Sequence, residues 1–213
     1  MEKLIQIKYE NVTLEGMLKI PPAAAGVVLF AHGSGSSRFS PRNNFVADVL
    51  NNAGLATLLI DLLSKQEDEN YQTRFDINLL TERLNLVVHW LKKQPDTQHL
   101  NIGLFGSSTG AAAALCVAAE MGKDIQAVVS RGGRPDLALD LLDRVTAPTL
   151  FIVGGDDFGV IELNQEAYRQ LTCFKKFEII PNATHLFEEP GCLEEVARLA
   201  KEWFNQYLTV NKR

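Results

Sequence analysis

This 213-residue sequence has few cysteines and no excess of positive charge. It has three cysteines, and its 21 Lys and Arg stand against 26 Asp and Glu, which gives a formal net charge of −5. Three widely spaced cysteines do not make a disulfide framework. The acidic balance argues against a broad basic face, so we expect no nucleic-acid partner.

The sequence also has no long apolar run. None approaches the roughly 20 residues of a membrane span, and residues 1–8 lack the apolar core of a signal peptide. We therefore expect a cytoplasmic protein with no membrane partner, either a monomer or a homodimer.

Cofactor motifs are missing as well. Neither a Gly-x-Gly-x-x-Gly pattern nor a P-loop follows the first parallel strand that we expect, which argues against a nucleotide-binding protein. The four histidines are scattered, and no ligand pair has metal spacing. We expect neither a metal nor a cofactor.

Short apolar runs alternate with amphipathic segments along the chain. Residues 4–9 and 12–20 are two predicted strands separated only by Glu10 and Asn11, which indicates an antiparallel hairpin. Buried strands are predicted at 26–31, 56–60, 102–105, 127–130, 149–153 and 177–180. Helices are expected at 45–53, 76–93, 109–121, 137–143, 161–171 and 193–207, and a solvated loop at 64–74.

This alternation from residue 26 onward requires a mostly parallel sheet with helices on both faces. The length suits one α/β domain, and the sequence has no internal repeat or linker. We therefore predict a single domain over residues 1–213.

The pattern Gly106-x-Ser108-x-Gly110 lies between a predicted strand and a predicted helix. In that context it is typical of the nucleophile elbow of serine hydrolases, in which glycines allow a tight turn and the serine hydroxyl stands clear of the sheet. Ser108 is the candidate nucleophile, because Ser107 is not midway between the glycines. The alternative for Ser108 is a helix N-cap.

A base and an acid should follow the nucleophile in the chain. His185 comes after the last predicted strand and is the candidate base, with a surface loop histidine as its alternative. His32 directly ends a strand and is interpreted as structural. Asp157 follows the strand 149–153 and is the candidate acid, although chemistry alone does not exclude its neighbour Asp156.

Two backbone N–H groups should form an oxyanion hole. One belongs to Thr109, the residue after the nucleophile. The other should come from the loop after the strand 26–31, where Ser34 is the first choice and Gly35 the second.

With these residues in place, the sequence resembles the α/β-hydrolases and, more narrowly, the dienelactone hydrolase-like family of small hydrolases. The resemblance covers nearly the whole chain and is carried by residues 30–38, 106–113, 130–136 and 183–191. It implies an α/β-hydrolase fold without a cap domain. In such relatives the acid stands three residues after the first glycine of its loop, which favours Asp157. The dienelactone hydrolases proper use cysteine where this chain has Ser108, so lactone substrates are not implied.

The predicted function is hydrolysis of a small-molecule ester or other acyl compound through an acyl-enzyme intermediate. A thioesterase, a peptidase or a perhydrolase would use the same triad, because only the leaving group or the acceptor differs. A non-catalytic binding module of the same fold is the other alternative. The complete set of Ser, His and Asp argues against it.

Four arginines stand in loops that should face the mouth of the site: Arg38, Arg42, Arg131 and Arg134. Guanidinium groups pair well with carboxylate or phosphate. One interpretation is therefore an anionic substrate, with Gly35, Arg38 and Arg131 as candidate substrate-binding residues. The other interpretation is that the arginines only brace their loops.

Overall fold

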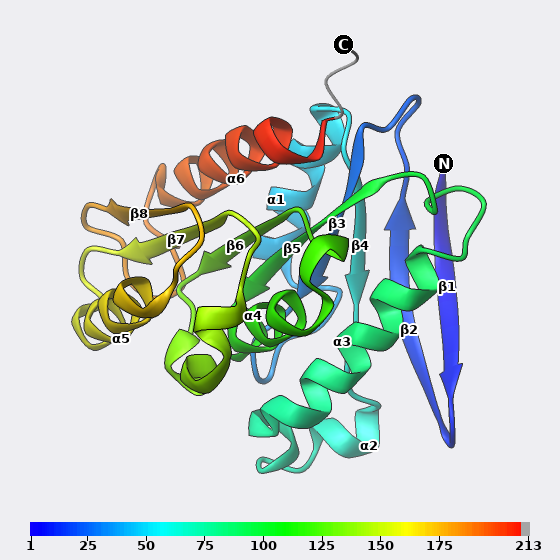
Figure 1. Ribbon diagram of the computed structural model, residues 1–213, viewed down its shortest axis with the longest axis horizontal. Coiled ribbons are helices and arrows are strands. Elements are labelled where there is room, and N and C mark those ends of the chain that lie inside the picture. Colours follow the sequence, from blue (N-terminus) through cyan, green and yellow to red (C-terminus); the bar gives the residue numbers. More distant parts are fainter. Residues whose placement is uncertain (210–213) are drawn as a thin grey trace.

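The apolar runs of the sequence form the buried centre of one eight-stranded sheet. The computed structural model describes residues 1–209, and its strands lie in the order β1-β2-β4-β3-β5-β6-β7-β8 (Figure 1). Their bounds are β1 Glu2–Tyr9, β2 Val12–Lys19, β3 Gly26–Ala31, β4 Ala56–Ile60, β5 Asn101–Ser107, β6 Ala127–Arg131, β7 Thr149–Gly154 and β8 Lys175–Ile180. The β1–β2 and β2–β4 pairs are antiparallel and all other neighbouring pairs are parallel. The predicted hairpin and mostly parallel sheet are confirmed.

Helices cover both faces of this sheet, as the amphipathic segments predict. The α-helices are α1 Pro41–Asn52, α2 Lys65–Asp68, α3 Ile77–Leu91, α4 Thr109–Met121, α5 Phe158–Gln170 and α6 Cys192–Leu208, and the 3-10 helices are η1 Thr73–Phe75, η2 Gly122–Asp124 and η3 Pro135–Arg144. In Figure 1, α1 and α6 lie on one face, and α3, α4 and α5 lie on the other. Within the described chain only η3 lies between β6 and β7, so no cap domain is inserted there.

The central strands are fixed by close packing. Phe30 of β3 and Phe105 of β5 are fully buried, and their ring centroids are 4.8 Å apart. Beside them, α6 lies close to the sheet at Gly103, where an added Cβ would lie 2.7 Å from the ring of Phe204. This packing holds the carboxyl ends of β3 and β5 side by side, where the polar loops of the sequence begin.

Two expectations about local structure are wrong, and helix capping explains both. Residues 64–74, expected to be a solvated loop, contain α2, because Ser64 and Glu67 form a capping box, and they also contain the start of η1. Helix α1 starts at Pro41, several residues before the predicted start. Ser40 caps it, and proline is favourable in the first helical turn.

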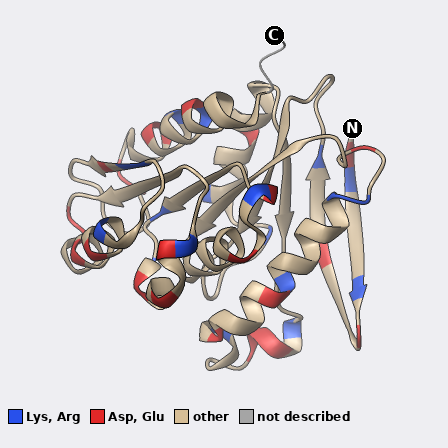
Figure 2. Cartoon of the chain, viewed as in Figure 1, with Lys and Arg blue, Asp and Glu red and all other residues tan. Residues whose placement is uncertain are grey.

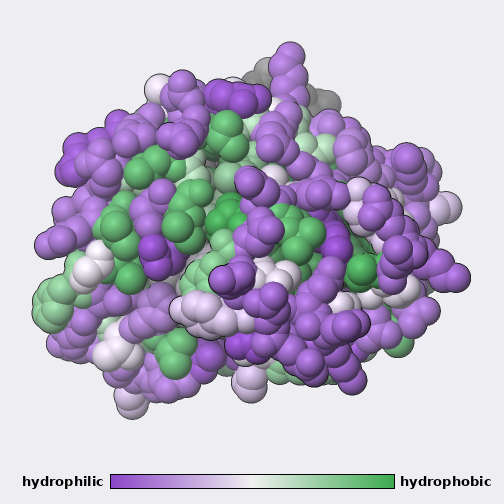
Figure 3. Space-filling view, turned by 90° about the horizontal axis from the view of Figure 1, so that it is seen from below, coloured by the Kyte–Doolittle hydropathy of each residue, from purple (hydrophilic) through white to green (hydrophobic). Residues whose placement is uncertain are grey.

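Charged residues of both signs are spread over the surface, and apolar residues gather on one face. Lys and Arg lie among Asp and Glu on α3, α5 and α6 (Figure 2). On the face in Figure 3, hydrophobic residues gather across the middle and hydrophilic residues surround them. Among residues 1–209, no helix has both the length and the apolar character needed to span a membrane.

Phe105→Ala should lower the free energy of unfolding by about 3–5 kcal/mol, because it leaves a cavity between fully packed strands. Phe158→Ala is the matched control, since Phe158 is 72% exposed at the start of α5. That control should change stability by about 0.5 kcal/mol or less. Urea unfolding followed by circular dichroism measures both variants. Similar losses in the two would contradict the packing between β3 and β5.

Candidate active site

Ser108 stands at a sharp turn between β5 and α4. The apolar run before it forms the strand, and the alanine-rich segment after it forms the helix. Its φ of 50° and ψ of −123° are costly for a residue other than glycine, on the order of 1–3 kcal/mol. The side chain makes no capping hydrogen bond to α4. Ser108 therefore occupies the N-cap position without acting as a cap, and its hydroxyl is free for another role.

The glycines on either side of Ser108 are required by close backbone contacts. A Cβ on Gly110 would collide with the carbonyl oxygen of Ala31 at the end of β3, and a Cβ on Gly106 would collide with the backbone of Ala111. Because glycine has no Cβ, α4 can begin directly against the two central strands. This contact places Ser108 at the carboxyl edge of the sheet, where ligands bind in open parallel sheets.

His185 and Asp157 form a hydrogen-bonded pair at the same edge. Nδ1 of His185 lies 2.7 Å from Oδ2 of Asp157, whose side chain is only 15% exposed. Asp156 is exposed, and its carboxylate has no hydrogen-bond partner in residues 1–209. The structure thus brings Asp157 to His185 and leaves Asp156 in solvent.

The loop that carries His185 is held by hydrogen bonds and passes close to Gly132. The N–H and the hydroxyl of Thr184 both donate to the carboxylate of Glu189, and these bonds lower the pKa of that carboxyl. On the other side stands Gly132, with φ 50°, where a Cβ would lie 3.5 Å from Cε1 of His185. The two hydrogen bonds to Glu189 therefore constrain the loop at the residue before His185.

Ser108 and His185 line one cavity of about 230 Å³, together with Ser34, Gly35, Arg42 and Arg131. No hydrogen bond joins the side chains of Ser108 and His185 in the described chain. Such contacts are often long in ligand-free enzymes and tighten when substrate binds. Ser36 and Ser40 also line the cavity, although the sequence suggested only that their loop is rich in glycine and serine.

The proposed oxyanion loop is joined to the elbow by a hydrogen bond. The N–H of Ser34 donates to Oγ1 of Thr109 over 3.0 Å. The N–H groups of Thr109 and Gly35 have no partner among residues 1–209. Of the three expected donors, Ser34 is therefore the one already occupied in this structure.

The four arginines expected at the mouth have different surroundings. Arg38 pairs with Asp61 and Glu15 and does not line the cavity. Arg134 makes a two-pronged pair with Asp136. These two brace their loops.

The other two arginines reach the cavity. Arg42 lies in the first turn of α1 rather than in a loop, and it pairs with Glu188 at 2.5 Å. Arg131 is the last residue of β6 and is buried, with an exposed fraction of 7%. Burial and the nearby charge of Arg42 lower the pKa of Arg131 to about 10.

His32 is part-buried at the end of β3. Its Nδ1 lies 3.0 Å from the carbonyl oxygen of Gly33, and its Nε2 lies 3.8 Å from Oδ1 of Asp61. It does not line the cavity of Ser108. A structural role for His32 stays a prediction.

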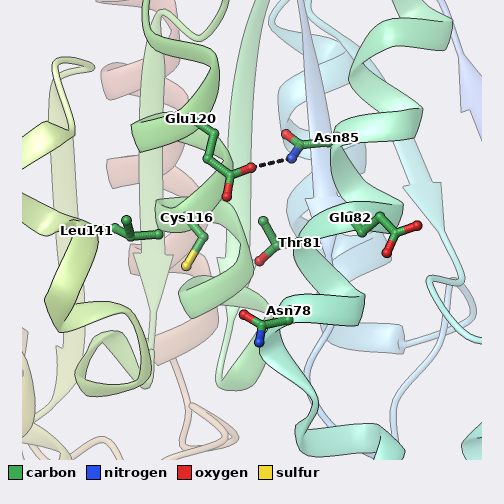
Figure 4. Close-up of a pocket in the computed structure, with 7 residues that line it drawn as sticks. All are labelled: Asn78, Thr81, Glu82, Asn85, Cys116, Glu120 and Leu141. Atoms are coloured by element: carbon green, nitrogen blue, oxygen red, sulfur yellow. Dashed lines mark hydrogen bonds between the residues drawn. The ribbon is translucent and has the colours of Figure 1, made fainter.

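A second cavity lies between α3 and α4 (Figure 4). There Asn85 donates to the carboxylate of Glu120 over 2.6 Å. Burial raises the pKa of the Cys116 thiol, so this group stays protonated and is a poor nucleophile. No histidine is among the lining residues of this cavity, so it does not hold the pair of nucleophile and imidazole found at Ser108. Residues 1–209 also contain no cluster of His, Cys, Asp and Glu that could hold a metal.

Comparison with known proteins gives a family. The profile of the dienelactone hydrolase family matches residues 14–210. A crystal structure of a dienelactone hydrolase from Anabaena variabilis ATCC 29413 is 57% identical, with a TM-score of 0.94 and coverage of 98% of each chain. Est1E from Butyrivibrio proteoclasticus, at 19% identity, shares the fold with a TM-score of 0.83 over 95% of this chain and 98% of its own.

Two curated relatives are longer proteins. Both are from Mycobacterium tuberculosis, are named provisionally as phosphoribosyl transferases, and are 54% identical over 204 residues. The match covers 96% of this chain and 46% of each relative, so the chain spans less than half of their length.

Thr109→Val should release the N–H of Ser34, because valine keeps the shape of threonine but has no hydroxyl to accept the bond. Loss of about 0.5–1.5 kcal/mol for one hydrogen bond should speed amide hydrogen exchange at Ser34 by about 2- to 10-fold. Thr109→Ser retains the hydroxyl and is the control. NMR measures the amide exchange rate at Ser34. Equal rates in Thr109→Val and the wild type would contradict this hydrogen bond.

Proposed function

Because the chain belongs to the dienelactone hydrolase family and is a hydrolase, we propose that it cleaves carboxylic esters of small molecules with Ser108 as nucleophile. The observation that carries the proposal is the meeting of three groups at one edge of the sheet. Ser108 is held in a strained turn, His185 lines the same cavity, and Asp157 bonds to His185. A nucleophile, a base and a group that orients the base are what acyl transfer requires.

The proposed reaction has two steps. Asp157 accepts the Nδ1–H of His185, which leaves Nε2 as the nitrogen that removes the proton of Ser108. Ser108 then attacks the substrate carbonyl, and His185 gives the proton to the departing alcohol. Water, activated by the same histidine, releases the acid from the acyl-enzyme and restores Ser108.

The oxyanion of each tetrahedral intermediate binds backbone N–H groups in this proposal. Thr109 supplies one, and its N–H has no competing partner in the described chain. Ser34 supplies the second once its N–H leaves Oγ1 of Thr109. Gly35 is the alternative donor.

Other acyl transfers share this machinery. A thioesterase, a peptidase or a perhydrolase would form the same acyl-enzyme, so the ester is proposed from the family. The transferase name of the mycobacterial relatives is not carried over, because it describes proteins of which this chain spans 46%. A non-catalytic module has no need for the strained turn at Ser108.

Ser108→Ala should lower kcat for p-nitrophenyl butyrate by about 10⁶, the loss expected when a triad nucleophile is removed. A fluorophosphonate probe should label the wild type at this serine and leave the variant unlabelled. Ser107→Ala is the matched control, since Ser107 is the last residue of β5 and is 3% exposed. A Ser108→Ala variant with the wild-type rate would end the proposal.

Asp157→Asn should lower kcat by about 10³–10⁴, because an amide in place of the carboxylate favours the wrong tautomer of His185. Asp156→Asn should leave kcat within about 2-fold, since Asp156 is exposed and has no contact with the imidazole. Steady-state kinetics on the same ester compare the two. A larger loss at Asp156 would transfer the role of the acid to that residue.

A further inference from the structure

Arg131 is a buried cation without a carboxylate partner. It ends β6 beside the elbow, 7% of it is exposed, and its guanidinium has one hydrogen-bond partner in residues 1–209, the amide oxygen of Asn43 at 3.4 Å. The guanidinium carbon also lies 5.7 Å from the ring centroid of Phe187. Neither contact neutralises the charge.

A buried charge without a partner is energetically unfavourable, and the other three arginines of this region each have a partner. Removing a cation from water costs several kcal/mol unless a partner compensates. Arg38, Arg42 and Arg134 each have a carboxylate partner. Although burial and Arg42 lower the pKa of Arg131 to about 10, it stays protonated at neutral pH. Arg131 is thus the exception among four neighbouring arginines, and it faces the cavity.

The lining residues of the cavity that carry a fixed charge are both cationic, in a chain whose net charge is −5. Two guanidinium groups, those of Arg42 and Arg131, line the cavity along with His185. His185 pairs with Asp157, and Arg42 pairs with Glu188, whose side chain is 61% exposed and therefore well hydrated. Like charges gathered in one cleft raise the local concentration of an anion, and the hydroxyls of Ser36 and Ser40 add hydrogen-bond donors.

We propose that Arg131 determines substrate specificity by binding a carboxylate or phosphate group of the substrate while Ser108 attacks its carbonyl. The proposal rests on the proposed function. Arg131 pairs in register with Ser107 on the neighbouring strand, and Arg131 and Ser108 line the same cavity, so one small substrate can contact both side chains. A cavity of about 230 Å³ likewise suits a small acid.

The test compares esters that differ only in charge. The p-nitrophenyl esters of butyric, succinic and 3-phosphonopropanoic acid place a methyl, a carboxylate or a phosphonate at the same point of the acyl chain. Phenyl acetate and 3-carboxyphenyl acetate test an anion on the alcohol side. The wild type should favour at least one anionic ester over its neutral partner, and the phosphonate and carboxylate arms identify the anion.

Arg131→Met removes the charge and keeps much of the volume. We expect it to raise KM at least 10-fold for the preferred anionic ester and to leave the neutral esters within about 2-fold. Arg131→Lys should restore part of the preference. Arg134→Gln is the control, because Arg134 pairs with Asp136 and does not line the cavity.

Stability separates this role from a bracing role. Removing an unpaired buried charge should leave Tm unchanged or raise it, whereas loss of a loop brace should lower it. Equal loss on neutral and anionic esters, a lower Tm for Arg131→Met, or no charge preference in the wild type would each overturn the inference. If Ser108 also failed to react with a fluorophosphonate, the proposed function itself would fail.

Discussion

The contact between Gly110 and the carbonyl oxygen of Ala31 is the constraint on which the site depends. It exists because α4 begins directly against the end of β3, and it leaves no room for a Cβ. Ser108 is two residues earlier and takes a positive φ to join strand and helix. The packing of Phe30 and Phe105 holds those strands in place. Core packing thereby supports the strain that presents the hydroxyl to the cavity.

Charge around the elbow is divided between bracing and binding. Asp61 accepts the backbone N–H and the guanidinium of Arg38, so the loop after β3 is fixed by a saturated pair. On the neighbouring strand, Arg131 is buried against Phe187 with its charge unsatisfied by any Asp or Glu that the structure describes. The pair of Arg38 and Asp61 makes its loop rigid, whereas the unpaired Arg131 can attract an anionic ligand. Residue type is the same in both cases, and only the surroundings differ.

The sequence predicts the parts of this molecule that depend on local pattern. Apolar runs predict the central strands, alternation predicts the hairpin of β1 and β2, and the strand–Gly-x-Ser-x-Gly–helix pattern predicts the turn at Ser108. Prediction from the sequence fails at α2. Its four residues are all polar, so they show no helical spacing of apolar residues, and the helix depends on a capping box instead. The sequence also does not show which charged side chains pair in three dimensions. Nothing in the sequence separates Arg38 from Arg131, because their partners come from distant segments.

The most direct test of the central claim is a crystal structure of the protein treated with a p-nitrophenyl alkylphosphonate whose short alkyl chain ends in a carboxylate. The account predicts a covalent bond from Oγ of Ser108 to phosphorus, with the phosphonyl oxygen within about 3 Å of the N–H of Thr109. It also predicts the carboxylate of the inhibitor on the guanidinium of Arg131. Phosphorus bound to another residue, or an inhibitor in the cavity that leaves Ser108 unmodified, would contradict it.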